Sequence, residues 1–80
     1  MPRLPQISGR ELIRLLESLG YETLRQRGGH VRLRRISVVG EHNVTVPDHK
    51  VMAKGTLNDI LTRVSVWTGL SKEELTKRLS

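Results

Sequence analysis

The N-terminal part of the chain carries leucines at helical spacing. They form one apolar stripe, as expected for a helix that buries one face: Leu12, Leu15, Leu16 and Leu19. Ser8 and Glu11 fit a capping box at its start, and Gly20 occupies the position where glycine commonly ends a helix. The pattern predicts a helix over Gly9–Leu19, preceded by a short arm of residues 1–7.

The middle of the chain alternates between apolar and polar residues, which predicts β-strands. Two such segments, Tyr21–Arg27 and His30–Val39, flank Gly28-Gly29, a pair suited to a two-residue hairpin turn. A second turn is expected near Gly40–Asn43, followed by a short third strand, Val44–Val46. Because the connections are short, we expect the three strands to form one antiparallel sheet.

The two-residue turn predicts the register of the first hairpin. Arg27 then faces His30, and Leu24 faces Leu33. Alternation places Leu24 and Leu33 on the buried side of the sheet together with Val31. The polar residues of the two strands are expected on the other side: Arg25, Arg27, His30, Arg32 and Arg34.

The last third of the chain returns to helical periodicity. Thr56 is a candidate N-cap for a helix whose apolar positions run from Leu57 to Trp67, and Gly69 ends the pattern. Ser71–Glu74 forms a second capping box, which begins a short helix that reaches about Leu79. The predicted fold is α+β in the order αβββα(α), with helices on one face of a three-stranded sheet.

Length and composition narrow the possible functions. A chain of 80 residues has room for one small domain, here residues 1–80, and its formal net charge of +6 makes a polyanion the expected partner. The absence of cysteine excludes disulfides and thiolate metal sites. With one tyrosine, one tryptophan and no phenylalanine, the chain lacks the aromatic platforms of typical single-strand readers. No apolar run has membrane-spanning length and no signal peptide is evident, so we expect a cytoplasmic protein.

The basic residues are concentrated in the predicted hairpin. Five arginines fall between Arg25 and Arg35 with no acidic residue among them. Like charges on neighbouring strands repel each other, and a bound phosphate chain would remove that repulsion. A solvated basic face screened by salt is the simpler alternative.

His30 lies among these arginines and offers proton-transfer chemistry near neutral pH. A neutral imidazole can deprotonate the 2′-hydroxyl of RNA for attack on the adjacent phosphate, while guanidinium groups stabilise charge on phosphorus. This reaction needs no metal ion or other cofactor. A surface histidine without a role is the alternative. A zinc site made from all three histidines (His30, His42 and His49) matches no known ligand spacing.

Seven segments that together span most of the chain are informative in this order: Ser8–Ile13, Leu19–Tyr21, Arg25–Leu33, Val44–His49, Lys54–Leu57, Ile60–Leu61 and Gly69–Ser71. In this order they resemble the HicA toxin family, the RNA-cleaving half of HicAB toxin–antitoxin systems.

The resemblance implies a fold similar to double-stranded RNA-binding domains and mRNA interferase activity. The catalytic histidine of the family matches His30, and a HicB-type antitoxin is expected to cover its face. Gly29 stands where the family often has serine, so that hydroxyl is lost. We expect no metal or other cofactor, and RNA contacts from Arg25, Arg27, Gly29, Arg32, Arg34 and Lys54.

Three functions remain open from the sequence. The first is a metal-independent endoribonuclease toxin with His30 as general acid and base. The second is a non-catalytic RNA-binding module that uses the same basic face. The third is an interaction protein whose basic face binds an acidic protein partner.

Overall fold

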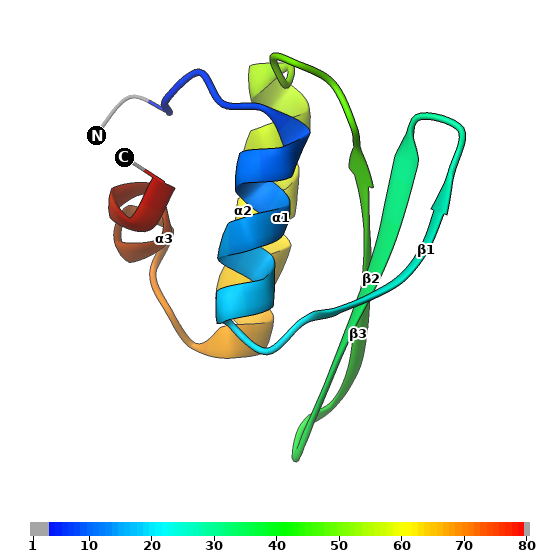
Figure 1. Ribbon diagram of the computed structural model, residues 1–80. Helices are drawn as coiled ribbons and strands as arrows, with labels where there is room; N and C mark the ends of the chain where they lie inside the picture. Colours follow the sequence, from blue (N-terminus) through cyan, green and yellow to red (C-terminus); the bar gives the residue numbers. More distant parts are fainter. Residues whose placement is uncertain (1–3, 80) are drawn as a thin grey trace.

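A computed structural model describes residues 4–79 of the chain (Figure 1). The elements are α1 (Gly9–Ser18), β1 (Glu22–Arg27), β2 (His30–Ser37), β3 (Gly40–Pro47), α2 (Lys54–Thr68) and α3 (Lys72–Leu79). The strands form one antiparallel sheet in the order β1-β2-β3. This architecture confirms the predicted α+β class and the predicted order of elements.

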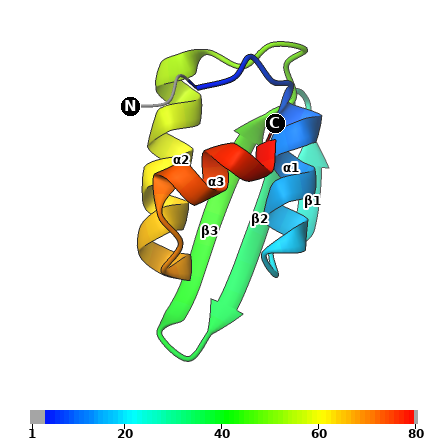
Figure 2. The same ribbon diagram turned by 90° about the vertical axis from the view of Figure 1, so that its left-hand side faces the viewer.

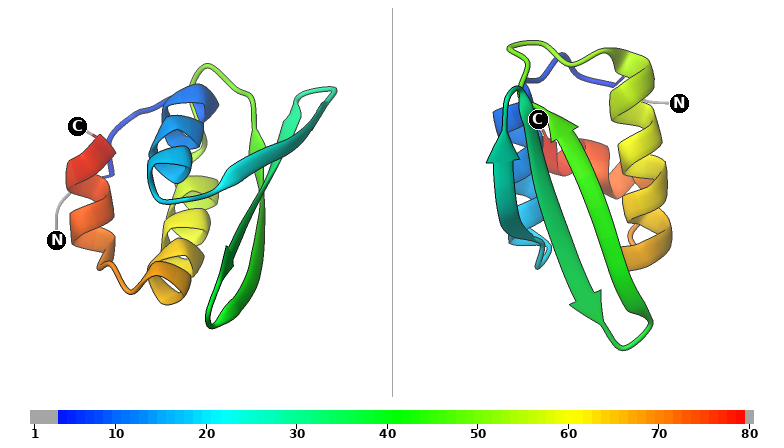
Figure 3. Two further views of the ribbon diagram at one scale, coloured as in Figure 1. Left: turned by 60° about the horizontal axis from the view of Figure 1, so that its bottom comes forward. Right: turned by 90° about the vertical axis from the view of Figure 1, so that its right-hand side faces the viewer.

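The three helices lie on one side of the sheet (Figure 1). Helices α1 and α2 lie apart from each other, and α3 crosses between them on the side away from the sheet (Figure 2). The opposite face of the sheet carries no helix and is open (Figure 3, right). The core between the sheet and the helices is aliphatic, and its fully buried side chains are Leu12, Leu16, Val31, Leu33, Val46, Leu57, Leu61, Val64 and Leu75.

Helix α1 begins at Gly9 as predicted and ends at Ser18, one residue before the predicted Leu19. The Ser8 hydroxyl accepts the backbone N–H of Glu11 at 3.1 Å, which is the capping-box bond. At the other end, the N–H of Gly20 bonds to the carbonyl of Glu17, and the N–H of Tyr21 bonds to that of Leu16. This pair of bonds is a Schellman motif, and it uses the positive φ of Gly20, 96°.

The described part of the expected N-terminal arm packs onto the domain. Ile7 is buried, and its carbonyl accepts the N–H of Met52 at 2.8 Å. Leu4 is partly buried against the same core. Residues 1–3 of the expected arm lie outside the described residues. Among the described residues, no helix is long and apolar enough to cross a bilayer.

The second hairpin differs from its prediction. The turn consists of Val38 and Val39, which were expected in a strand, and β3 begins at Gly40, where a turn was expected. The reason is the positive φ of Gly40, 128°, which supplies the backbone conformation that the tight reversal requires. The valines mimic a strand in sequence, yet Val38 is fully exposed at the tip.

Leu24 is not on the buried side, contrary to its prediction. The expected pair Arg27↔His30 is present and Arg25 pairs with Arg32, but Leu33 pairs with Thr23, because a β-bulge interrupts β1 between Thr23 and Arg25. The extra residue of the bulge is therefore Leu24, which is 41% exposed. Sequence alternation gives no sign of this irregularity.

Helix α2 starts earlier than predicted. It begins at Lys54 after Ala53, which makes no side-chain capping bond, so the expected N-cap Thr56 lies inside the first turn. The apolar positions from Leu57 to Val64 are buried as predicted, and Gly69 ends the helix with a φ of 77°. The second capping box is present in part, because the Ser71 hydroxyl accepts the N–H of Glu74 at 3.0 Å.

Candidate functional site

The open face of the sheet gathers the basic residues of the first hairpin. Cross-strand pairing places Arg25 beside Arg32, Arg27 beside His30, and Arg34 beside Glu22. Side chains of paired residues project to the same side of a sheet. We call this surface the open face, and its residues on β1 and β2 are Glu22, Arg25, Arg27, His30, Arg32, Arg34 and Ile36.

The arginines of the open face are free to meet a ligand. Arg25, Arg27 and Arg32 are exposed, and Arg34 is half-buried. Within residues 4–79, these four guanidinium groups have no hydrogen bond or ion pair. Two like charges, Arg25 and Arg32, are therefore paired on this surface without an anionic partner, and a phosphate chain would supply one.

The fold brings acidic residues near the basic cluster, which the local sequence did not indicate. Glu22 pairs with Arg34 across β1 and β2, and Glu41 pairs with Ile36 across β2 and β3. Both lie toward the part of the open face away from His30. The positive charge of this face is thus strongest around His30, Arg27 and Arg32.

His30 is the first residue of β2 and lies directly after the Gly28-Gly29 turn. Gly28 has a φ of 58°, whereas Gly29 is not among the positive-φ residues, the pattern of a type II′ turn. His30 is exposed and pairs with Arg27 on one side and Pro47 on the other. Its imidazole therefore lies at the rim of the open face, within reach of solvent and of a large ligand.

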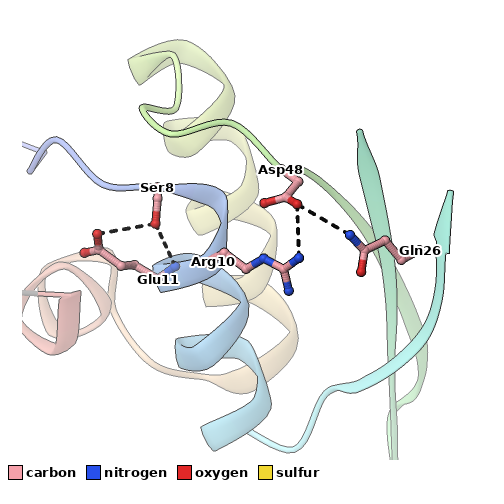
Figure 4. Close-up of polar contacts among 5 residues, drawn as sticks. All are labelled: Ser8, Arg10, Glu11, Gln26 and Asp48. Carbon is pink, nitrogen blue, oxygen red and sulfur yellow. Dashed lines mark hydrogen bonds and ion pairs between the residues drawn. The ribbon is translucent and has the colours of Figure 1, made fainter. Parts of the chain in front are cut away.

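The segment after β3 holds this turn in place. The backbone N–H of Asp48 donates to the carbonyl of Gly29 at 2.7 Å. The carboxylate of Asp48 accepts a hydrogen bond from Arg10 at 3.2 Å and a longer one from Gln26 at 3.5 Å (Figure 4). These contacts join α1 and β1 to the segment that follows β3. Sequence reasoning missed them, because the partners of Asp48 lie 22 and 38 residues away.

Gly9 explains how this segment approaches α1 so closely. A Cβ on Gly9 would lie 2.1 Å from the carbonyl oxygen of Pro47, so only glycine fits. The Gly9 N–H also donates to the carbonyl of His49 at 2.9 Å. The N-terminus of α1 is thereby docked on the chain that follows β3.

Arg35 and Lys54 differ from the other candidate cations. Arg35 projects to the helix side of the sheet, where it donates to the carbonyl of Leu19 at 3.0 Å and to that of Trp67 at 3.1 Å. It therefore ties the ends of α1 and α2 to β2. Lys54 is exposed at the first position of α2, in the helix layer and not on the open face.

His42 is a buried core residue, although the sequence placed it in a turn. It lies in β3 and is 8% exposed, and its Nδ1 is 2.6 Å from the hydroxyl oxygen of Tyr21. Its ring also stacks on Trp67, with centroids 5.1 Å apart and planes within 5°. His30 and His42 lie on opposite faces of the sheet, so the three histidines are not arranged to share one metal ion.

Burial keeps the Tyr21–His42 pair neutral. Desolvation, followed by the charges of Arg63 and Arg35, lowers the pKa of His42 from its usual 6.5. Desolvation raises the pKa of Tyr21 above 10.0, and the charge of Arg35 partly opposes this. The pair therefore serves packing and hydrogen bonding in the core. We assign it no part in chemistry on the open face.

Comparison with known proteins agrees with the resemblance seen in the sequence. The family model described as the HicA toxin of bacterial toxin–antitoxin systems matches residues 9–66, well over half of the chain. No curated protein and no solved structure gives a significant match. The expected likeness to double-stranded RNA-binding domains therefore stays a prediction. On the family match, the chain belongs to the HicA toxin family.

Proposed function

We propose that this HicA-family toxin is a metal-independent endoribonuclease that cleaves mRNA at the open face. The observation that carries the proposal is an exposed imidazole, His30, at the rim of a surface whose arginines lack partners within the described chain. Such guanidinium groups bind phosphate oxygens, often in bidentate geometry. An imidazole at this place can transfer protons to and from the ribose of a bound strand.

The proposed reaction begins with RNA seated on the arginines. His30 removes the proton of a 2′-hydroxyl, and the resulting oxygen attacks the adjacent phosphorus. The bond from phosphorus to the 5′-oxygen breaks, leaving a 2′,3′-cyclic phosphate and a 5′-hydroxyl that takes its proton from water. Arg27 pairs with His30 and Arg32 lies two residues after it, and we propose that both stabilise the extra negative charge on phosphorus.

The HicA family also supports an antitoxin partner, because its toxins belong to toxin–antitoxin systems. We propose that a HicB-type antitoxin covers the open face and blocks access to His30. An acidic surface on that protein would pair with the same arginines that hold RNA. Antitoxin and RNA would then compete for one surface.

A non-catalytic RNA-binding module is the second candidate, and the free arginines favour it equally. The two candidates differ only in what His30 does. Binding by either mechanism weakens steeply with added salt, since phosphate contacts release counterions.

Paired induction of the wild type and His30→Ala in cells tests the proposal. We expect the wild type to degrade RNA and arrest growth, and His30→Ala to do neither while it still binds RNA. The matched control is His49→Ala, which removes another exposed imidazole at the same end of the sheet. Cleavage by purified wild type in EDTA tests metal independence, and mapped ends should carry a cyclic phosphate. Equal toxicity of His30→Ala would refute the catalytic role.

A further inference from the structure

The two edges of the sheet differ in how they are protected. The β1 edge is interrupted by the bulge at Leu24 and carries two exposed arginines, features that discourage pairing with another strand. The β3 edge is regular, because every residue from Gly40 to Pro47 pairs with β2. The side chains along β3 that share the open face include no lysine: Glu41, Asn43, Thr45 and Pro47.

The register shows which backbone groups of β3 are free. Ser37 and Gly40 close a two-residue turn, so this pair exchanges both of its hydrogen bonds. Every second residue of β3 then bonds to β2, and the bond from Asp48 to Gly29 continues that series. The N–H and C=O groups of the residues in between point away from the sheet: Glu41, Asn43 and Thr45.

An open groove of about 360 Å³ runs along this edge. One wall is β3 from His42 to Thr45, and the other is α2, which lies beyond the edge of the sheet (Figure 3, right). Asp59 and Arg63 on α2 line the groove, and within the described residues neither forms an ion pair or hydrogen bond. The groove thus offers backbone donors, backbone acceptors and both signs of charge.

We propose that this groove binds an extended polypeptide strand of a protein partner, which adds to the sheet beside β3. A strand satisfies both the N–H and the C=O groups of the edge, and an acidic side chain on it reaches Arg63. A phosphate group fits less well, because it can use only the backbone N–H donors and leaves the C=O acceptors unpaired. A second copy of this chain fits less well than a peptide strand. Because α2 lies beyond the β3 edge, pairing β3 with β3 about a two-fold axis would push the two α2 helices against each other.

This surface is distinct from the open face around His30, so the inference does not rest on the proposed nuclease activity. Its probe is a capped peptide of about seven residues that alternates threonine and valine, with a central glutamate. Titrated into the ¹⁵N-labelled full chain, it should shift the amide signals of Asn43 and Thr45 saturably. It should also slow their hydrogen exchange by about tenfold or more. The same peptide with alternate amides N-methylated on one edge should not bind.

Two variants locate the contact. Thr45→Pro removes an N–H that β2 does not use, and edge strands tolerate proline at such positions. It should abolish peptide binding, whereas Thr45→Val, which keeps the N–H, should bind within about twofold of the wild type. Arg63→Gln should weaken the glutamate peptide and leave its glutamine analogue unchanged. If Thr45→Pro does not fold, the N-methylated peptide gives the same test.

Three results would overturn the inference. The first is the absence of shifts at Asn43 and Thr45 at millimolar peptide. The second is an RNA oligonucleotide that perturbs these amides when the peptide does not, which would assign the groove to nucleic acid. The third is a concentration-dependent shift of the same amides without peptide, which would assign it to a second copy.

Discussion

The hydrogen bond between Tyr21 and His42 is a sharp test of how the core is held together. Tyr21→Phe deletes one oxygen atom and leaves Nδ1 of His42, a residue only 8% exposed, without its partner at 2.6 Å. The loss of a net hydrogen bond, together with a buried ring nitrogen that has no partner, costs about 1–3 kcal/mol. For a domain of this size, each kcal/mol lowers the melting temperature by roughly 4–8 °C.

The double variant Tyr21→Phe/His42→Phe separates the lost bond from the lost packing. A phenylalanine at position 42 keeps a flat ring against Trp67, and it removes the ring nitrogen that Tyr21→Phe leaves without a partner. Replacing both polar partners with apolar groups is nearly neutral in many proteins. The double variant should therefore recover a large part of the stability that Tyr21→Phe loses.

Urea unfolding followed by the fluorescence of Trp67, the only tryptophan, measures both effects in one assay. The free energies of the wild type, the two single variants and the double variant complete a thermodynamic cycle. The reasoning would be refuted if Tyr21→Phe unfolded within about 0.5 kcal/mol of the wild type, the range usual for surface substitutions.

Three further predictions concern pH, the turn and the inward arginine. The pKa of His42 is lowered below 6.5 in the folded state, so as the pH falls the unfolded chain takes up the proton first. The free energy of unfolding should therefore fall as the pH drops below 6.5. Urea midpoints should show this fall in the wild type and much less of it in His42→Phe. Gly29→Ser, where a side chain meets nothing within 4 Å, should leave the melting temperature nearly unchanged. Gly28→Ser should lower the free energy of unfolding by about 1 kcal/mol, because a serine is strained at the positive φ of 58°. Equal melting temperatures of the Gly28→Ser and Gly29→Ser variants would contradict the turn geometry. Arg35→Met should cost about 2 kcal/mol through its two carbonyl bonds, while Arg32→Met on the open face should stay within about 0.5 kcal/mol by urea unfolding.

Interactions between near neighbours in the chain were readable from the sequence. The Ser8 cap, the glycine end of α1 and the Gly28-Gly29 turn depend on residues within a few positions of one another. Their geometry follows from local backbone preferences, which any packing of the domain must respect. The register that this turn sets also predicts that the basic residues around His30 share one side of the sheet.

Only the tertiary structure decided where the local pattern is overruled. The bulge at Leu24 appears only in the pairing of β1 with β2, and the burial of His42 depends on packing and on its bond to Tyr21, 21 residues away. Arg35 shows the physical reason. In the sequence, Arg35 cannot be told apart from the neighbouring arginines. In the fold its side chain faces the helices, where carbonyl groups at the ends of α1 and α2 accept its hydrogen bonds. Whether a polar residue meets a partner or meets water is settled by what the fold places opposite it, and the order of residues along the chain does not carry that information by itself.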